Sequence, residues 1–217
     1  MPFAIVVTGL IFIFLIPSEN ILLRFIFKLV PMLLIIFYGY LQIRSIPSTY
    51  QKLIIFGLIC CTLGDAFIIF SFIFGLVAFL IGHLFYISAF IRKWKINWIK
   101  SLALIPIVLY ALFFGYQLVT ALSQSERSEL IIPVICYITV ISIMGLAAMM
   151  TGEKTAILGS ALFIISDTIL SWNMFISNIA YSGHWIMLTY YNAQFLIALT
   201  IADKSTNTYI KPANYRL

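Results

Sequence analysis

Charge is the property that this sequence has least of. Only 9% of its 217 residues are charged, whereas 63% are hydrophobic, and the mean hydropathy is +1.10. Soluble globular domains usually contain about 25% charged residues. The composition therefore excludes a soluble domain and is typical of an integral membrane protein.

Cysteine and histidine are also scarce. The three cysteines, Cys60, Cys61 and Cys136, lie in apolar runs without metal-ligand spacing, so we interpret them as packing residues and expect no disulfide framework. A membrane zinc hydrolase needs about three His or carboxylate ligands. Of the two histidines, His184 is expected near a span end, which leaves His83 as the deep imidazole. We therefore expect neither a metal nor another cofactor.

A basic stripe with interleaved aromatic residues is missing as well. The net charge of +6 does not by itself indicate nucleic acid, because Lys and Arg in a membrane protein report orientation first. We expect no nucleic-acid partner, and no protein partner is predicted. Residues 1–16 contain no Lys or Arg and no clear cleavage site, so they predict a retained first helix and not a signal peptide.

Long apolar segments separated by polar or turn-forming breaks are what the sequence does have. They predict an all-α bundle of eight transmembrane helices in a single domain over residues 1–217. The predicted spans are Pro2 to Ile16, Phe25 to Leu41, Leu53 to Phe72, Phe74 to Ile91, Trp98 to Val119, Leu130 to Met150, Thr155 to Ile176, and His184 to Ala202. The break between the third and fourth spans is weak, so seven spans are the alternative.

The basic residues favour eight spans with both termini in the cytoplasm. Cytoplasmic loops are rich in Lys and Arg, and ten of the thirteen then lie inside: Arg44, Lys52, Arg92, Lys93, Lys95, Lys100, Lys154, Lys204, Lys211 and Arg216. Only Arg24 and Arg127 fall in outer loops. The tryptophans Trp94, Trp98 and Trp185 lie near span ends, as interfacial anchors do. We expect the inner membrane in a bacterium, or the endoplasmic reticulum membrane in a eukaryote.

An internal repeat is indicated by an offset of 102 residues, which aligns Asp65 with Asp167 and Pro31 with Pro133. Both pairs fall on spans that run in the same direction, which predicts a parallel four-plus-four duplication. Identity elsewhere is poor, so chance coincidence is the alternative.

Few polar residues lie within the predicted spans, where an Asp costs about 2.5 to 3.5 kcal/mol. They are Lys28, Asp65, His83, Asp167, Tyr190, Tyr191, Asn192 and Gln194. At the rise of an α-helix, most of them are expected roughly 9 to 15 Å from the outer ends of their helices, with Lys28 at about 5 Å. The sequence therefore predicts one polar cavity in the outer half of the bilayer.

Structural roles are the alternative for each polar residue. Lys28 either forms an ion pair with a carboxylate or extends to the lipid head groups, and His83 is equally consistent with packing. Some of the residues from Tyr190 to Gln194 are expected to pack against neighbouring helices. Asn173, Asn178 and His184 are interpreted as loop or interface residues, and Glu153 with Lys154 as a solvated turn.

Two carboxyls in a site of low dielectric do not both ionise easily, so one acts as a general acid beside a general base. That pair suits cleavage through an oxocarbenium-like cation, as in glycosidases. Serine hydrolase chemistry is not indicated, because the sequence has no GxSxG elbow.

Several stretches resemble those of one family. "LGDAFII", "FGLVAFLIGHLFYISAF", "PVICYITVISIM", "GSALFIISDTILSWNMF" and "MLTYYNAQFLIAL", together with "KLVP" at 28–31, are similar to the signature stretches of the YhhN-like lysoplasmalogenase family. The resemblance covers about residues 25–202. It implies a membrane enzyme that hydrolyses the vinyl ether bond of choline or ethanolamine lysoplasmalogens to a fatty aldehyde and glycerophosphocholine or glycerophosphoethanolamine.

The resemblance also implies roles for particular residues. Asp65 and Asp167 correspond to the family's catalytic aspartates, and the substrate-binding positions would be Lys28, His83, Tyr86, Tyr190, Tyr191 and Gln194. Asn192 departs from the small apolar residue expected there. The implied partners are a lysophospholipid, membrane lipids and water. A lipid-binding or transport protein without chemistry, and a hydrolase of another lysolipid, are the alternative functions.

Overall fold

The computed structural model describes residues 1–17, 19–43, 46–95, 102, 104–125 and 127–202. Within that part of the chain every regular element is helical and no strand is present. The expectations placed on Arg44, Trp98, Lys100, Lys204, Lys211 and Arg216 fall outside the described residues.

Each predicted span corresponds to one long helix. The elements are α1 (Pro2–Leu15), α2 (Ile21–Leu41), α3 (Thr49–Phe67), α4 (Phe72–Ile91), α6 (Leu104–Gln124), the 3₁₀ helix η1 (Ser128–Leu130), α7 (Ile131–Thr151), α8 (Lys154–Phe175) and α9 (Ser182–Leu199). In the described part of the chain, six of these are long and apolar enough to cross a bilayer, namely α2, α3, α4, α6, α7 extended by η1, and α8. The chain is therefore a multi-pass membrane protein.

The weak break between the third and fourth predicted spans is a real turn, so these two spans are separate helices and do not merge into one. The amides of Phe70 and Ser71 donate to the carbonyl of Phe67 at 2.9 and 2.8 Å, and this turn ends α3 five residues before the predicted boundary. Gly75 makes the reversal possible, because a Cβ there would lie 2.7 Å from the Cβ of Ile68.

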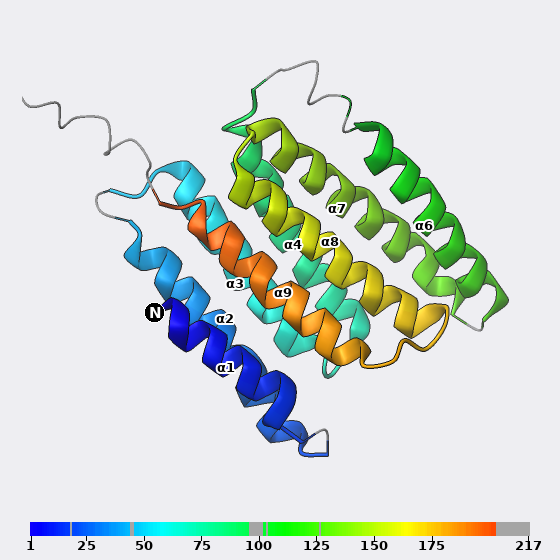
Figure 1. Cartoon of the computed structure of the whole chain (residues 1–217). Coiled ribbons are helices and arrows are strands. Elements are labelled where there is room, and N and C mark those ends of the chain that lie inside the picture. The colour runs from blue at the N-terminus through cyan, green and yellow to red at the C-terminus, as the bar shows by residue number, and fades with distance from the viewer. Residues whose placement is uncertain (18, 44–45, 96–101, 103, 126, 203–217) are drawn as a thin grey trace, which may run out of the picture.

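The helices form one bundle in which α4 and α9 are central (Figure 1). In Figure 1 the α1 and α2 pair lies at one side, with α1 against α9, and α6 lies at the opposite side against α7 and α8. The largest core cluster joins buried residues from both halves of the chain, and a smaller one lies between α6 and α7. Residues far apart in the sequence therefore meet along α4 and α9.

Packing between helices partly follows the expected repeat. α3 packs on α4 as α8 packs on α9, and α2 contacts α9 as α7 contacts α4. The proline pair does not follow it, because Pro31 lies in the middle of α2 whereas Pro133 is the third residue of α7.

Small residues let α3 approach α4 closely. A Cβ on Gly57 would lie 2.3 Å from Cε1 of Tyr86, and one on Gly64 would lie 2.8 Å from Cδ2 of Phe79. Both glycines therefore provide space for an aromatic ring of α4. Gly64 directly precedes Asp65, so the aspartate is held on a tightly packed helix pair.

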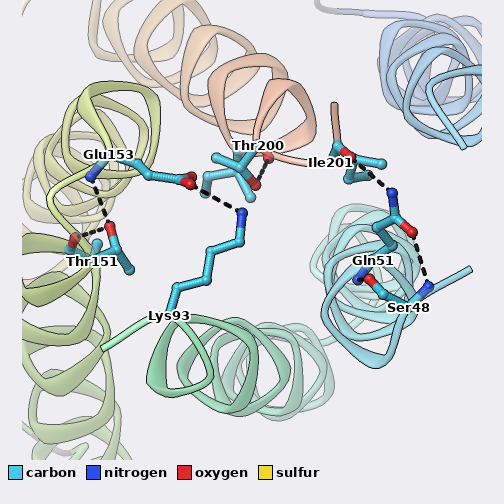
Figure 2. A network of polar contacts seen from close by, with 9 residues as sticks. Ser48, Gln51, Lys93, Thr151, Glu153, Thr200 and Ile201 are labelled. Carbon is cyan, nitrogen blue, oxygen red and sulfur yellow. Dashed lines mark hydrogen bonds and ion pairs between the residues drawn. The ribbon is translucent and has the colours of Figure 1, made fainter. Parts of the chain in front are cut away.

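Polar contacts join the helix ends opposite the α8–α9 connection (Figure 2). Lys93 Nζ lies 3.0 Å from Oε1 of Glu153 and 3.8 Å from the centroid of the Tyr50 ring. Nearby, Gln51 Nε2 donates to the carbonyl of Ile201 at 3.0 Å. The expected solvated turn at Glu153 is therefore corrected, because its carboxylate binds the end of α4 and is not simply hydrated.

Candidate active site

A cavity of about 700 Å³ opens at the end of the bundle where α8 connects to α9. Its walls come from the last turns of α1, α3 and α8, the first turns of α2 and α9, and one residue of α4. Because helix ends from both halves of the chain converge there, residues more than 100 positions apart share one space. We call its rim, at Arg24, Tyr181 and His184, the mouth.

Four of the sequence-predicted site residues line this cavity: Lys28, Asp65, Asp167 and Tyr190. They come from four different helices, α2, α3, α8 and α9. Both predicted catalytic carboxyls thus face one space, which is the arrangement that the sequence predicted for them. The remaining lining is mainly apolar, with Phe12 and Ile13 of α1 among the wall residues.

Asp65 forms an ion pair with Lys28. Its Oδ1 lies 3.0 Å from Lys28 Nζ, and the carboxyl side chain is only 3% exposed. A buried charge is tolerated when it is paired, so the ammonium favours the ionised form of this carboxyl. The expectation of an ion pair with a carboxylate is confirmed, and Lys28 does not extend to head groups.

Asp167 has a different partner, which is the hydroxyl of Tyr137. The phenol donates to Oδ2 of Asp167, and Tyr137 is a buried residue of α7. A neutral donor stabilises the negative charge of a carboxylate less than a charged ammonium does. The two carboxyls of the cavity therefore differ in their electrostatic surroundings.

Tyr137 was missed by the sequence prediction. It lies within the stretch "PVICYITVISIM", four residues after Pro133, but a tyrosine in an apolar helix is usually read as a packing residue. The one signal in the sequence was that Tyr137 follows Pro133 by one helical turn.

His83 is not part of the cavity lining. The side chain is fully buried, and neither ring nitrogen has a hydrogen-bond partner among the described residues. Its ring lies against Phe163, with centroids 4.6 Å apart, and 5.4 Å from the ring of Tyr137. His83 therefore packs against Tyr137 and Phe163 and does not reach the cavity.

The expectation that Asp65 and His83 share one depth is corrected. His83 lies eleven residues into α4, about 16 Å along the helix, whereas Asp65 lies two residues, about 3 Å, from the end of α3. The prediction failed because it extended the third span to Phe72, and this placed Asp65 too deep in its helix.

The other predicted binding residues lie beside or beneath the cavity. Tyr86 donates to Oε1 of Gln194 at 2.6 Å, and both side chains are fully buried. Tyr191 donates to the backbone carbonyl of Lys28 at 2.9 Å. Tyr190, which lines the cavity, donates to the carbonyl of Cys61 at 3.4 Å. These contacts hold α9 against α2, α3 and α4.

Asn192 does not line the cavity but is one of the residues around a smaller, mainly apolar groove between α1 and α9. Its side-chain amide donates to the carbonyl of Leu188 at 2.8 Å, within its own helix. The polar side chain that replaces the expected small apolar residue is therefore hydrogen-bonded within α9, and it does not alter the cavity.

The α8–α9 connection forms one side of the mouth. Asn173 lies in the last turn of α8 and not in the loop, and its Oδ1 accepts from the loop amide of Ile179 at 2.9 Å. Tyr181 adopts a left-handed backbone conformation, with φ of 56°, directly before α9. Asn178 of the loop and His184 in the first turn of α9 line the cavity here, so both contribute to its entrance.

Together these features define a class: a helical, multi-pass membrane protein whose interior cavity holds two acidic side chains with unlike partners. Within that class the chain belongs to the YhhN family, whose sequence profile it matches over residues 23–201. No curated protein and no solved structure matches the chain significantly.

Proposed function

We propose that the protein is a lysoplasmalogenase, which cleaves the vinyl ether bond of a lysoplasmalogen to release a fatty aldehyde. The observation that carries the proposal is that Asp65 and Asp167 line one cavity with different partners, an ammonium and a phenol. Such a pair provides an anion and a proton donor side by side. Vinyl ether hydrolysis needs both.

The partners suggest which carboxyl holds the proton. Lys28 favours the carboxylate form of Asp65, and a second negative charge in the same cavity is then disfavoured. Asp167 therefore carries the proton. Tyr137 binds one carboxyl oxygen of Asp167, which leaves the other oxygen to deliver the proton to the substrate.

In the proposed reaction, Asp167 transfers its proton to the alkene carbon that bears the alkyl chain. The vinyl ether becomes an oxocarbenium ion, and the Asp65 carboxylate stabilises its positive charge. Water then adds to this cation and returns a proton to Asp167. The resulting hemiacetal collapses to the aldehyde and the free hydroxyl of the glycerophospho product, so all atoms and charges balance.

Eight spans with both termini in the cytoplasm are part of the proposal. The mouth then faces the outer side, and Lys93 with Glu153 lies at the cytoplasmic side. The excess of basic residues in the loops opposite the mouth supports this orientation. The matched packing of α3 on α4 and α8 on α9 supports a four-plus-four duplication. The membrane would be the inner membrane in a bacterium or the endoplasmic reticulum membrane in a eukaryote.

A panel of lysolipids separates this function from its alternatives. Purified protein is incubated with 1-alkenyl, 1-alkyl and 1-acyl lysophospholipids of matched chain length, and aldehyde and fatty acid are measured. We expect aldehyde from the alkenyl lipid and no product from the other two. Fatty acid from the acyl lipid would indicate a different hydrolase, and binding without any product would favour a lipid-binding or transport protein.

A further inference from the structure

Two basic residues of α2 line the cavity at different depths. Arg24 and Lys28 are four residues apart, so they project from the same face of the helix, and both line the cavity wall. Arg24 lies at the mouth and is exposed, whereas Lys28 is largely buried. The wall thus has one cation at its entrance and one cation further in.

These two cations differ in whether they are neutralised. The ammonium of Lys28 is bound to Asp65 at 3.0 Å. Among the described residues, the only other ion pair joins Lys93 to Glu153, so no carboxylate of that set neutralises Arg24. The guanidinium therefore presents an uncompensated positive charge to whatever enters the cavity.

We propose that Arg24 binds the phosphate of a lysophospholipid at the mouth, an inference that rests on the proposed function. The family resemblance implied that Lys28 binds substrate, but its ammonium is occupied by Asp65. A guanidinium also suits the task better, because its planar donors bind two phosphate oxygens at once.

The spacing along α2 suits such a ligand. Arg24 and Lys28 are separated by about 6 Å of helix rise, which is close to the length of an extended glycerol phosphate. A phosphate on Arg24 therefore leaves the ether end of the glycerol beside the Lys28–Asp65 pair. The apolar side chains of Phe12 and Ile13 on α1, with Ile16 directly after it, provide the wall for an alkyl chain.

A binding experiment with a ligand that cannot react tests this site. The full-length protein in detergent is titrated with a 1-alkyl lysophospholipid and, separately, with the 1-alkylglycerol of equal chain length, which has no phosphate. Wild type is compared with Arg24→Gln and Arg24→Lys. The matched control is Arg127→Gln, which removes the same charge from an exposed residue outside the cavity.

Arg24→Gln is expected to lower the affinity for the lysophospholipid by about tenfold or more. Arg24→Lys should lower this affinity less, and Arg127→Gln should leave it unchanged. The alkylglycerol should bind all four proteins equally. Inorganic phosphate should compete with the lysophospholipid in wild type only weakly, because it lacks the alkyl chain. Equal thermal unfolding temperatures show that the variants are folded.

Two results would overturn the assignment. If wild type and Arg24→Gln bind the lysophospholipid with equal affinity, the phosphate binds elsewhere. If Arg24→Gln and Arg127→Gln lower the affinity equally, the effect comes from general surface charge and not from a site at Arg24. The ligand has no vinyl ether, so a protein that binds it through Arg24 but releases no aldehyde from a lysoplasmalogen contradicts the proposed reaction and leaves the phosphate site standing.

Discussion

Asp65 and Asp167 are the same residue type in the same cavity, and their neighbours make them different. Lys28 binds Asp65 directly, whereas Tyr137 donates a neutral hydrogen bond to Asp167. In the proposed mechanism this difference assigns the anion to Asp65 and the proton to Asp167. Lys28 and Tyr137 therefore matter to the proposed reaction as much as the carboxyls do.

Removing the ammonium should damage both stability and turnover. Lys28→Met leaves Asp65 buried without its counter-ion, and breaking a buried pair typically costs about 3 to 5 kcal/mol. We expect a clearly lower thermal unfolding temperature and an aldehyde release rate reduced by about a hundredfold or more. In the double variant Lys28→Met with Asp65→Asn, stability should recover and activity should not. Recovery of activity would contradict a role for the Asp65 anion.

Removing the phenol should affect turnover more than binding. Tyr137→Phe takes away the donor to Asp167, so we expect kcat to fall by about tenfold while KM stays unchanged, because Tyr137 acts through the acid. Tyr110→Phe is the matched control, since the hydroxyl of Tyr110 is hydrogen-bonded to Thr168 at 2.7 Å and not to a carboxyl. Equal effects of the two substitutions on kcat would show that Tyr137 has only a packing role.

At the scale of helix pairs, α3 carries Asp65, and α4 carries Tyr86, whose hydroxyl donates to Gln194 of α9. Gly57→Ala places a Cβ 2.3 Å from Cε1 of Tyr86. The ring must then move away from Gln194, and overpacking of this kind typically costs about 1 to 3 kcal/mol. We expect a lower unfolding temperature and reduced aldehyde release.

Gly115→Ala is the control for that substitution. A Cβ at Gly115 of α6 meets nothing within 4 Å, and Ala is favoured over Gly in a helix by about 0.8 to 1.0 kcal/mol. Unchanged or slightly raised stability is therefore expected. A loss equal to that of Gly57→Ala would mean that any added methyl group disturbs the bundle, and that Tyr86 is not specifically displaced.

Hydropathy predicted the existence and order of the long helices, because apolar segments of span length leave few other structures open to the chain. It did not predict where α3 ends. The turn from Ile68 to Ser71 is almost entirely apolar, so composition carries no signal there, and the reversal depends on Gly75 packing against Ile68. The wrong boundary then misplaced Asp65 relative to His83.

The whole molecule has two unlike ends. One end holds the cavity and its mouth. At the other end Lys93 forms an ion pair with Glu153 (Figure 2) and a cation–π contact with Tyr50. Surface ion pairs contribute only about 0.2 to 1 kcal/mol to stability, so this end is stabilised mainly by packing between the helices. The ion pair and the cation–π contact add specificity to that packing. A substrate is then expected to enter at the mouth.

The candidate site was partly predictable from the sequence. An acid in an apolar helix is costly and marks a functional position by default, so Asp65 and Asp167 were found from their positions in apolar segments. Their partners were not, because which helix faces which depends on packing. Tyr137 and Arg24 lie in ordinary sequence contexts. Arg24 becomes notable only because α2 lines the cavity, and Tyr137 only because α7 packs where its hydroxyl reaches Asp167.

Aldehyde release from a lysoplasmalogen by wild type, Asp65→Asn and Asp167→Asn tests the proposed reaction most directly. The three proteins are purified in the same detergent, matched for unfolding temperature and treated with a chelator. We expect wild type to release one aldehyde per glycerophospho product and each variant to be slower by about a hundredfold or more. Near-normal rates in both variants would contradict catalysis by the two carboxyls.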